Sequence, residues 1–224
     1  CDATCQSASG LTLDSDDDGD NVDDNLDIAP LNNAVGALPT TSPDNPGTEG
    51  NPYLISTLAH LQGLSTAQGY WASGVHLKLT ADIDASDTAT WNVGDHDNDG
   101  VTADVPMGFS PVGSETNPFQ GSFDGAGFAI SNLTVNRPGT GRVGLFGTTD
   151  SAVIENIGLV DVAIEGAGSV GGLVGYESSG TAITNSYASG SVTGNNNWVG
   201  GLVGYANSTS IAGSYAAAAV SSSG

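Results

Sequence analysis

One heptapeptide, Val-Gly-Gly-Leu-Val-Gly-Tyr, occurs twice in this chain, at residues 170–176 and again at 199–205. A looser copy, Val-Gly-Leu-Phe-Gly, occupies residues 143–147, so successive copies begin 27 and 29 residues apart. A second landmark keeps nearly the same spacing, because Ile183 and Ile211 each follow their copy at a similar offset. A fixed interval of this size is typical of one supersecondary unit that stacks on copies of itself.

Each repeat unit is long enough for about three short strands, which together make one turn of a solenoid. A stack of such turns predicts an all-β fold in which parallel strands from successive turns lie side by side. The leucine of each glycine motif and the apolar residue after it are expected to point inward and stack on their equivalents. Three isoleucines are expected to stack in the same way: Ile154, Ile183 and Ile211.

The corners of the turns are expected to be formed by glycine and asparagine. Glycine adopts positive φ at no steric cost and allows two backbones to approach closely. Asparagine also tolerates the left-handed conformation, and its side chain can hydrogen-bond to the same residue of the next turn. Asn132, Asn156 and Asn185 each follow an isoleucine by two residues, so we predict that they form a ladder that ends at Gly213.

The charge of the chain excludes some classes of partner. It has 25 acidic and only 3 basic residues among 224, for a formal net charge of −22. Nucleic acids and anionic membranes require a cationic surface, so this balance argues against both as partners. No run of about 18 apolar residues occurs, and so no transmembrane helix is predicted. Much of the excess charge lies in two short aspartate-rich runs, which indicates cation binding.

The first aspartate-rich run, at residues 14–27, matches the spacing of a calcium-binding loop. Oxygen ligands at alternating positions allow a short loop to surround a cation of flexible geometry. The predicted ligands are Asp16, Asp18, Asp20, the carbonyl of Val22, Asp24 and Asp27. The run resembles the thrombospondin type 3 repeats of secreted and surface proteins, and the residues 27–30 that close it, Asp-Ile-Ala-Pro, fit that family. A solvated acidic linker is the alternative interpretation.

A second run, at residues 95–104, has a similar alternation of acidic residues and a glycine where such a loop turns. Its predicted ligands are Asp95, Asp97, Asp99, the carbonyl of Val101 and Asp104. Asp104 lies one residue beyond the usual ninth position, so the far side of this site departs from the common pattern. A flexible acidic insertion is the alternative interpretation.

We divide the chain into four segments by composition and pattern. Residues 1–30 hold the first acidic run, and residues 31–50 are predicted to be a linker because they are rich in proline and glycine. Residues 51–118, with the acidic insertion at 95–104, are expected to cap the N-terminal end of the solenoid. Residues 119–224 are expected to form its turns.

The capping segment is predicted to contain a short helix between two strands. Tyr53–Ile55 forms the first strand, and residues 75–84, which alternate apolar and polar side chains, form the second. Ser56 or Thr57 can cap the helix, whose leucines share one face.

Two further features concern the ends of the chain. Cys1 and Cys5 are the only cysteines. A disulfide between them is expected in an exported protein, and a lipid on Cys1 is the alternative. The chain neither begins with methionine nor closes its last repeat, so we interpret it as part of a longer protein.

The repeats resemble the GLUG motif, which is named for a Gly-Leu-x-Gly core. That core occurs at residues 144–147, 172–175 and 201–204, and segments upstream of it are similar to those that lead into such repeats. The similarity covers about residues 51–224. GLUG arrays occur in large bacterial surface proteins, including adhesins and haemagglutinin-like exoproteins. The resemblance implies a right-handed parallel β-helix at a bacterial cell surface or in secreted material, and it implies no catalytic chemistry.

The sequence therefore favours a non-enzymatic structural and adhesive module of an exported surface or matrix protein, stiffened by calcium. Its predicted partners are Ca²⁺ ions, further copies of itself, or a glycan of a host or matrix. A filament subunit that polymerises through its open end is one alternative. Another is a polysaccharide-active enzyme, since parallel β-helices also host lyases and hydrolases. For such chemistry the chain offers few basic groups: Lys78, Arg137 and Arg142.

Overall fold

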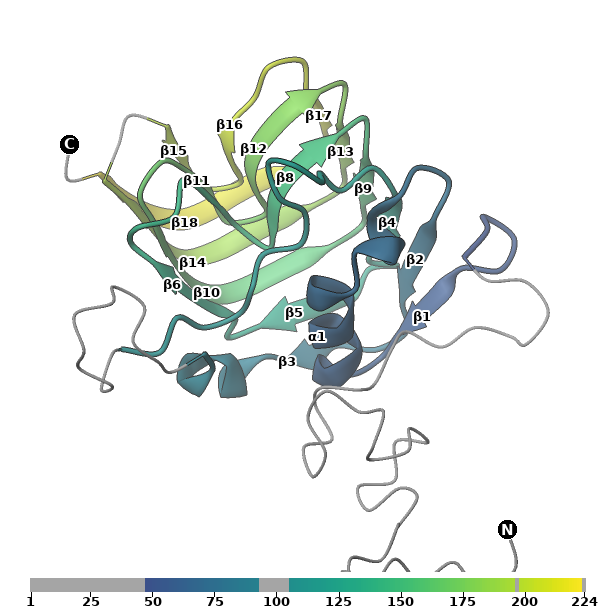
Figure 1. Ribbon diagram of the computed structural model, residues 1–224, viewed down its shortest axis with the longest axis horizontal. Coiled ribbons are helices and arrows are strands. Elements are labelled where there is room, and N and C mark those ends of the chain that lie inside the picture. Colours follow the sequence, from purple (N-terminus) through teal and green to yellow (C-terminus); the bar gives the residue numbers. More distant parts are fainter. Residues whose placement is uncertain (1–46, 93–104, 196–197, 223–224) are drawn as a thin grey trace, which may run out of the picture.

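The computed structural model describes residues 47–92, 105–195 and 198–222. These residues form a parallel β-solenoid of about three turns, with one short α-helix beside its first strands (Figure 1). All pairings between the named strands are parallel. The predicted all-β solenoid with a short helix in its N-terminal region is therefore confirmed.

Four sheets enclose the core. The first sheet consists, in spatial order, of β1 (Tyr53–Ile55), β2 (His76–Leu79), β4 (Ser122–Asp124), β9 (Val153–Glu155), β13 (Ala182–Thr184) and β17 (Ser210–Ala212). The second consists of β3 (Ile83–Asp84), β5 (Ala129–Ser131), β10 (Gly158–Gly166), β14 (Tyr187–Gly194) and β18 (Tyr215–Ser222), with β6 (Thr134–Arg137) also paired to β10.

Two three-stranded sheets complete the turns. One consists of β7 (Arg142–Val143), β11 (Ser169–Gly171) and β15 (Val199–Gly200). The other consists of β8 (Phe146–Asp150), β12 (Val174–Ser179) and β16 (Val203–Tyr205). A complete repeat therefore has four strands rather than the expected three, because the chain bends within the glycine motif, between β11 and β12.

Residues at equivalent positions of successive repeats are paired in the sheets. Val170 pairs with Val199, Tyr176 with Tyr205, and Ile183 with Ile211, so residues that match in the sequence lie side by side in the sheets. The inward positions of the motif form continuous apolar columns, as predicted. One column contains the leucines Leu145, Leu173 and Leu202, which are 0%, 0% and 8% exposed. Ile154 and Ile183 are fully buried in another, whereas Ile211, on the last described turn, is 48% exposed.

The N-terminal segment both extends the sheets and supplies the helix. α1 (Leu58–Thr66) begins after Thr57, whose hydroxyl accepts a hydrogen bond from the backbone N–H of His60 at 3.1 Å. Leu61 and Leu64 are buried, and the Trp71 indole donates to the Leu64 carbonyl at 2.8 Å. Trp71 lies in a 3₁₀-helix, η1 (Gln68–Trp71).

The single strand predicted for residues 75–84 is in fact two strands. β2 belongs to the first sheet and β3 to the second, and the residues between them turn the chain from one sheet to the other. Alternation continues through this corner because Leu77, Leu79 and Ile83 all point into the core. A second 3₁₀-helix, η2 (Ser86–Thr90), follows β3.

The motif glycines serve close approach rather than positive φ. Among the described residues the positive-φ glycines include Gly190 and Gly213 but none of the glycines of the three motif copies. At Gly175, a Cβ atom would collide with the backbone of Arg142 and Val143 in the preceding turn. The expectation of positive φ at these glycines was therefore wrong, whereas the expectation that they allow two backbones to approach closely is confirmed.

The asparagine ladder is present at one corner but with different members. Asn156 and Asn185 have φ of 54° and 48°, and Gly213 follows with 62°. The Asn185 amide donates to Asn156 Oδ1 at 3.2 Å, and the Asn156 amide donates to Asp124 Oδ1 at 2.9 Å. Asn132 belongs to another corner, after β5 of the second sheet, where its amide donates to Asp84 at 3.0 Å. The predicted place of Asn132 in the ladder was wrong, and Asp124 takes it.

We predict that Gly175→Ala destabilises the solenoid, because the neighbouring atoms are backbone and cannot move aside. Overpacking of this kind costs about 1–3 kcal/mol, and we expect the upper end. Gly139→Ala is the matched control, since a Cβ there meets nothing within 4 Å. Its effect should stay within about 0.5 kcal/mol. Urea unfolding of the three proteins measures both changes, and equal stability of the two variants would contradict the close-approach explanation.

Candidate functional site

The predicted calcium ligands lie outside the described residues. This holds for all eleven: Asp16, Asp18, Asp20, Val22, Asp24, Asp27, Asp95, Asp97, Asp99, Val101 and Asp104. Cys1 and Cys5 lie outside them as well. Calcium binding and the disulfide therefore stay predictions.

The structure does describe the residues on either side of the segment that contains the second acidic run. The backbone N–H of Met107 donates to the Asn92 carbonyl at 3.4 Å, and the Asn92 amide donates to the Gly108 carbonyl at 2.5 Å. The N–H of Phe109 donates in turn to the Thr134 carbonyl at 2.8 Å, which ties this point to β6. The chain thus leaves and re-enters the described fold at one place. A segment whose ends are already held together loses less conformational entropy when it closes around a ligand.

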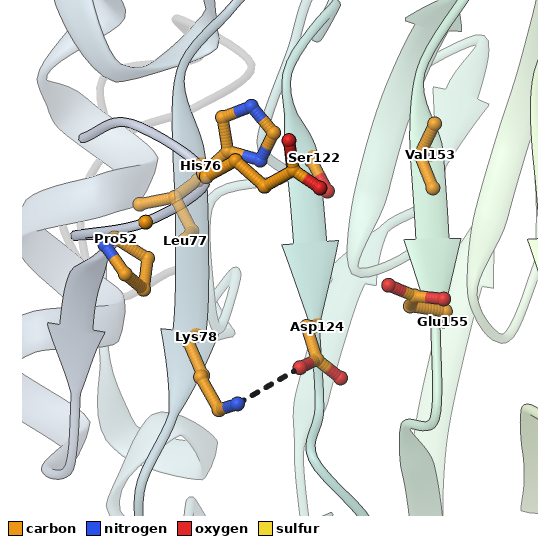
Figure 2. A pocket seen from close by; sticks show the side chains of 10 residues that line it. Pro52, His76, Leu77, Lys78, Ser122, Asp124, Val153 and Glu155 are labelled. Atoms are coloured by element: carbon orange, nitrogen blue, oxygen red, sulfur yellow. Dashed lines mark ion pairs between the residues drawn. The ribbon is translucent and has the colours of Figure 1, made fainter.

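A groove of about 520 Å³ runs over the outer surface of the first sheet (Figure 2). Its floor consists of two rows of side chains that the parallel register creates across β2, β4 and β9. One row is Lys78, Asp124 and Glu155, and the other is His76, Ser122 and Val153. The loop at residues 49–52 borders it.

Asp124 is the most constrained charged group of this groove. Its carboxylate accepts hydrogen bonds from the Asn156 amide at 2.9 Å and the Ala126 N–H at 2.8 Å, and it lies 3.3 Å from Lys78 Nζ. Partial burial alone raises the pKa of Asp124, but these hydrogen bonds and Lys78 outweigh burial and hold the pKa below its ordinary value. Asp124 is therefore a fixed anion at neutral pH.

The groove is suited to polar recognition. His76 and Ser122 pair across neighbouring strands. Activation of a serine nucleophile requires a hydrogen bond between imidazole and hydroxyl, and none joins these two side chains in the described structure. Likewise, no group of three His, Cys, Asp or Glu residues that could hold a metal ion occurs among the described residues. Side chains of both charges, a hydroxyl and an imidazole remain to contact a hydrogen-bonding ligand.

Sequence reasoning missed the role of Glu177, which is 0% exposed. Its Oε2 accepts hydrogen bonds from the N–H groups of Asn207 and Ser208 and from the Thr209 hydroxyl, at 2.8–2.9 Å. Its Oε1 accepts from the N–H of Thr181 at 3.2 Å. Glu177 thus connects the loop after β12 to the equivalent loop of the next turn.

The hydrogen bonds explain how Glu177 stays charged inside the protein. Burial alone raises the pKa of its carboxyl, but four donors to the carboxylate outweigh burial and bring the pKa below its ordinary value. In the preceding turn Thr149 occupies the equivalent position. The sequence did contain a signal for this role, because Glu177 is an acid at a repeat position that is uncharged in the other turns.

Comparison with known proteins identifies the repeat. Residues 166–193 match the family model described as the GLUG motif, which confirms that resemblance. Halomucin of Haloquadratum walsbyi is 42% identical over 164 residues, which are 70% of this chain and 2% of that protein. A protein of Evansella cellulosilytica named as a Gly-rich membrane protein is 34% identical over 133 residues, 58% of this chain and 14% of its own length. The chain thus spans only a small part of these relatives.

One solved structure is also similar. It is a Bacteroides ovatus protein named as an immunoglobulin A1 protease, and the match covers 79% of this chain and 69% of that one at 18% identity, with a TM-score of 0.40. Among the described residues, no helix has the length and apolar character needed to cross a membrane.

We predict that Glu177→Gln lowers the free energy of unfolding by about 2–3 kcal/mol at pH 7, because donors that face a carboxylate would face an amide. Glu165→Gln is the control, since this side chain lies on the outer surface of β10, and it should change stability by no more than about 0.5 kcal/mol. Urea unfolding measures both.

The same carboxylate predicts a pH dependence. Because the pKa of Glu177 is lower in the folded protein than its ordinary 4.5, its contribution is complete above that pH and is lost as the pH falls through the folded pKa. Stability of the wild type should therefore fall more steeply than that of Glu177→Gln below pH 4.5. Parallel acid profiles for the two proteins would show that Glu177 is not a charged link between turns.

Proposed function

We propose that this chain is a structural module of an exported surface protein, in which a rigid β-solenoid presents calcium-binding loops and a polar recognition surface. The observation that carries the proposal is that equivalent residues of successive repeats pair with each other in the sheets. Repeated side chains such as Leu173 and Ile183 are buried where successive turns pack against each other, so they are not available to a ligand. A motif used in this way builds a scaffold.

The relatives support the location. One is named halomucin and the other a membrane protein, and both are much longer than this chain. We infer that the chain belongs to the surface-exposed or secreted part of a comparable long protein. An adhesive role for the groove beside Lys78 and Asp124 is part of this proposal, since that groove offers polar groups to a glycan or a matrix polymer.

Calcium is the second part of the proposal. Twelve of the 25 acidic residues lie in the runs at 14–27 and 95–104, where like charges repel one another without a cation. Alternating aspartates supply the oxygen ligands that Ca²⁺ prefers. For the second run, the contacts of Asn92 with Met107 and Gly108 support the proposal, because they hold the ends of the loop together before any metal binds.

We predict that chelation lowers the melting temperature and increases protease cleavage at residues 14–30 and 95–104, because the acidic runs lose the ion that neutralises them. Asp97→Asn and Asp18→Asn should each weaken Ca²⁺ binding by at least about tenfold, a change of about 1.4 kcal/mol. Calorimetric titration and thermal melting with and without chelator measure these effects.

Asp87→Asn is the control for charge, since Asp87 is an exposed acid of η2 outside both runs. It should leave the calcium affinity unchanged. Identical melting curves with and without chelator would overturn the calcium part, and the proposal of a surface scaffold would then rest on the solenoid alone.

A further inference from the structure

Two of the three basic residues of this acidic chain line one groove. This second groove, of about 400 Å³, contains Arg137, at the end of β6, and Arg142, at the start of β7. Glu115 and the hydroxyl side chains of Ser110, Ser114 and Thr140 also line it. The net charge of the chain is −22, so a site where arginines outnumber acids departs from the rest of the surface.

The charges of Arg142 and Glu115 compensate each other. Arg142 Nη2 lies 2.8 Å from Glu115 Oε1, and its guanidinium carbon lies 4.4 Å from the centre of the Tyr176 ring. Tyr176 in turn stacks on Tyr205 with ring centres 4.7 Å apart. Arg142 is thus held between an ion pair and an aromatic column, and it adds no free charge to the groove.

Arg137 has no such partner. Within the described residues no carboxylate lies within 4.0 Å of its guanidinium. Its Nε donates to the Phe109 carbonyl at 3.1 Å and its Nη2 donates to Ser110 Oγ at 2.9 Å, and both acceptors are neutral. The positive charge of Arg137 therefore remains uncompensated in this groove.

This charge is also partly removed from water. Burial lowers the pKa of Arg137, although a guanidinium remains protonated in any folded protein. A desolvated charge is stabilised by a counter-ion, and a guanidinium has five N–H donors, of which the two bonds named above use two. Its planar fork matches the paired oxygens of a carboxylate or a sulfate group.

A second orphaned group lies in the same wall. Thr148 lines the groove and is 2% exposed, and its hydroxyl has no hydrogen-bond partner among the described residues. Buried polar groups without partners are rare in folded proteins, and such a group indicates a ligand, a water molecule or an ion.

We propose that this groove is an oxyanion-binding subsite, in which Arg137 pairs with a carboxylate or sulfate group of a hydroxyl-rich ligand such as an acidic saccharide. The hydroxyls of Ser110, Ser114 and Thr140 provide donors and acceptors around that group. The subsite does not depend on calcium, so it stands apart from the proposed role of the acidic runs.

The test consists of separate titrations of the whole chain with glucuronate, inorganic sulfate and neutral glucose. Binding is measured by calorimetry and by the NMR signal of the Arg137 Nε–H. Glucuronate and sulfate should bind with a Kd on the order of 1 mM, as expected of one charged contact, and glucose should not. A response to glucuronate that exceeds the response to sulfate assigns the site to a saccharide carboxylate, and the reverse assigns it to a sulfate group.

Three variants give the test its direction. Arg137→Gln should weaken binding at least tenfold, whereas Lys78→Gln, which removes the same charge from the other groove, should leave it unchanged. Glu115→Gln should strengthen binding severalfold, because it releases Arg142 from its ion pair. Absence of saturable binding by either anion, or equal affinity in Arg137→Gln, would overturn the proposal and leave Arg137 as a support for Phe109 and Ser110. The Nε–H signal of the wild type decides the matter even if that variant does not fold.

Discussion

The parallel hydrogen-bond register between turns is the constraint on which the rest of this molecule depends. Neighbouring strands lie about 4.8 Å apart, so each side chain faces its equivalent in the turns above and below. β14 and β18 keep this register over eight consecutive residue pairs. Side chains that interact favourably with an identical side chain are therefore favoured. The Tyr187 and Tyr215 rings stack with an angle of 7° between their planes, and the Asn185 amide donates to Asn156. Like charges would repel in such columns, and residues 178–222 contain none.

The repeat made most of the fold predictable, because spacing along the chain translates directly into register. The cap of α1 was predictable as either Ser56 or Thr57, of which the structure shows Thr57, since capping depends on local chemistry. Asn132 was misplaced because its local pattern equals that of Asn156, while the sheet to which each strand belongs is set by the whole turn. The groove with Arg137 could not be predicted, since Ser110 and Arg137 meet only through the fold.

The residues with distinctive chemistry lie largely outside the clear repeats. Arg137 and Arg142 flank the turn between β6 and β7, and Asp124 lies on β4. Asn92 and Gly108, which are hydrogen-bonded to each other, lie on either side of the segment that contains the second acidic run. Glu177 is the exception within the repeats, and it serves the joining of turns. From residue 178 onward the turns therefore form a scaffold without charged side chains, and the earlier part of the chain carries the groups that can recognise a ligand.

The equality of repeat length and turn length also has a consequence for inheritance. The copies at residues 170–176 and 199–205 are identical in amino-acid sequence, and they occupy the same place in successive turns. A crossover there adds or removes one whole turn and leaves every remaining column intact. A one-residue shift within a strand would instead turn inward residues such as Leu173 to the surface. Gain or loss of a whole turn is therefore a change in length that this fold tolerates without repacking its core.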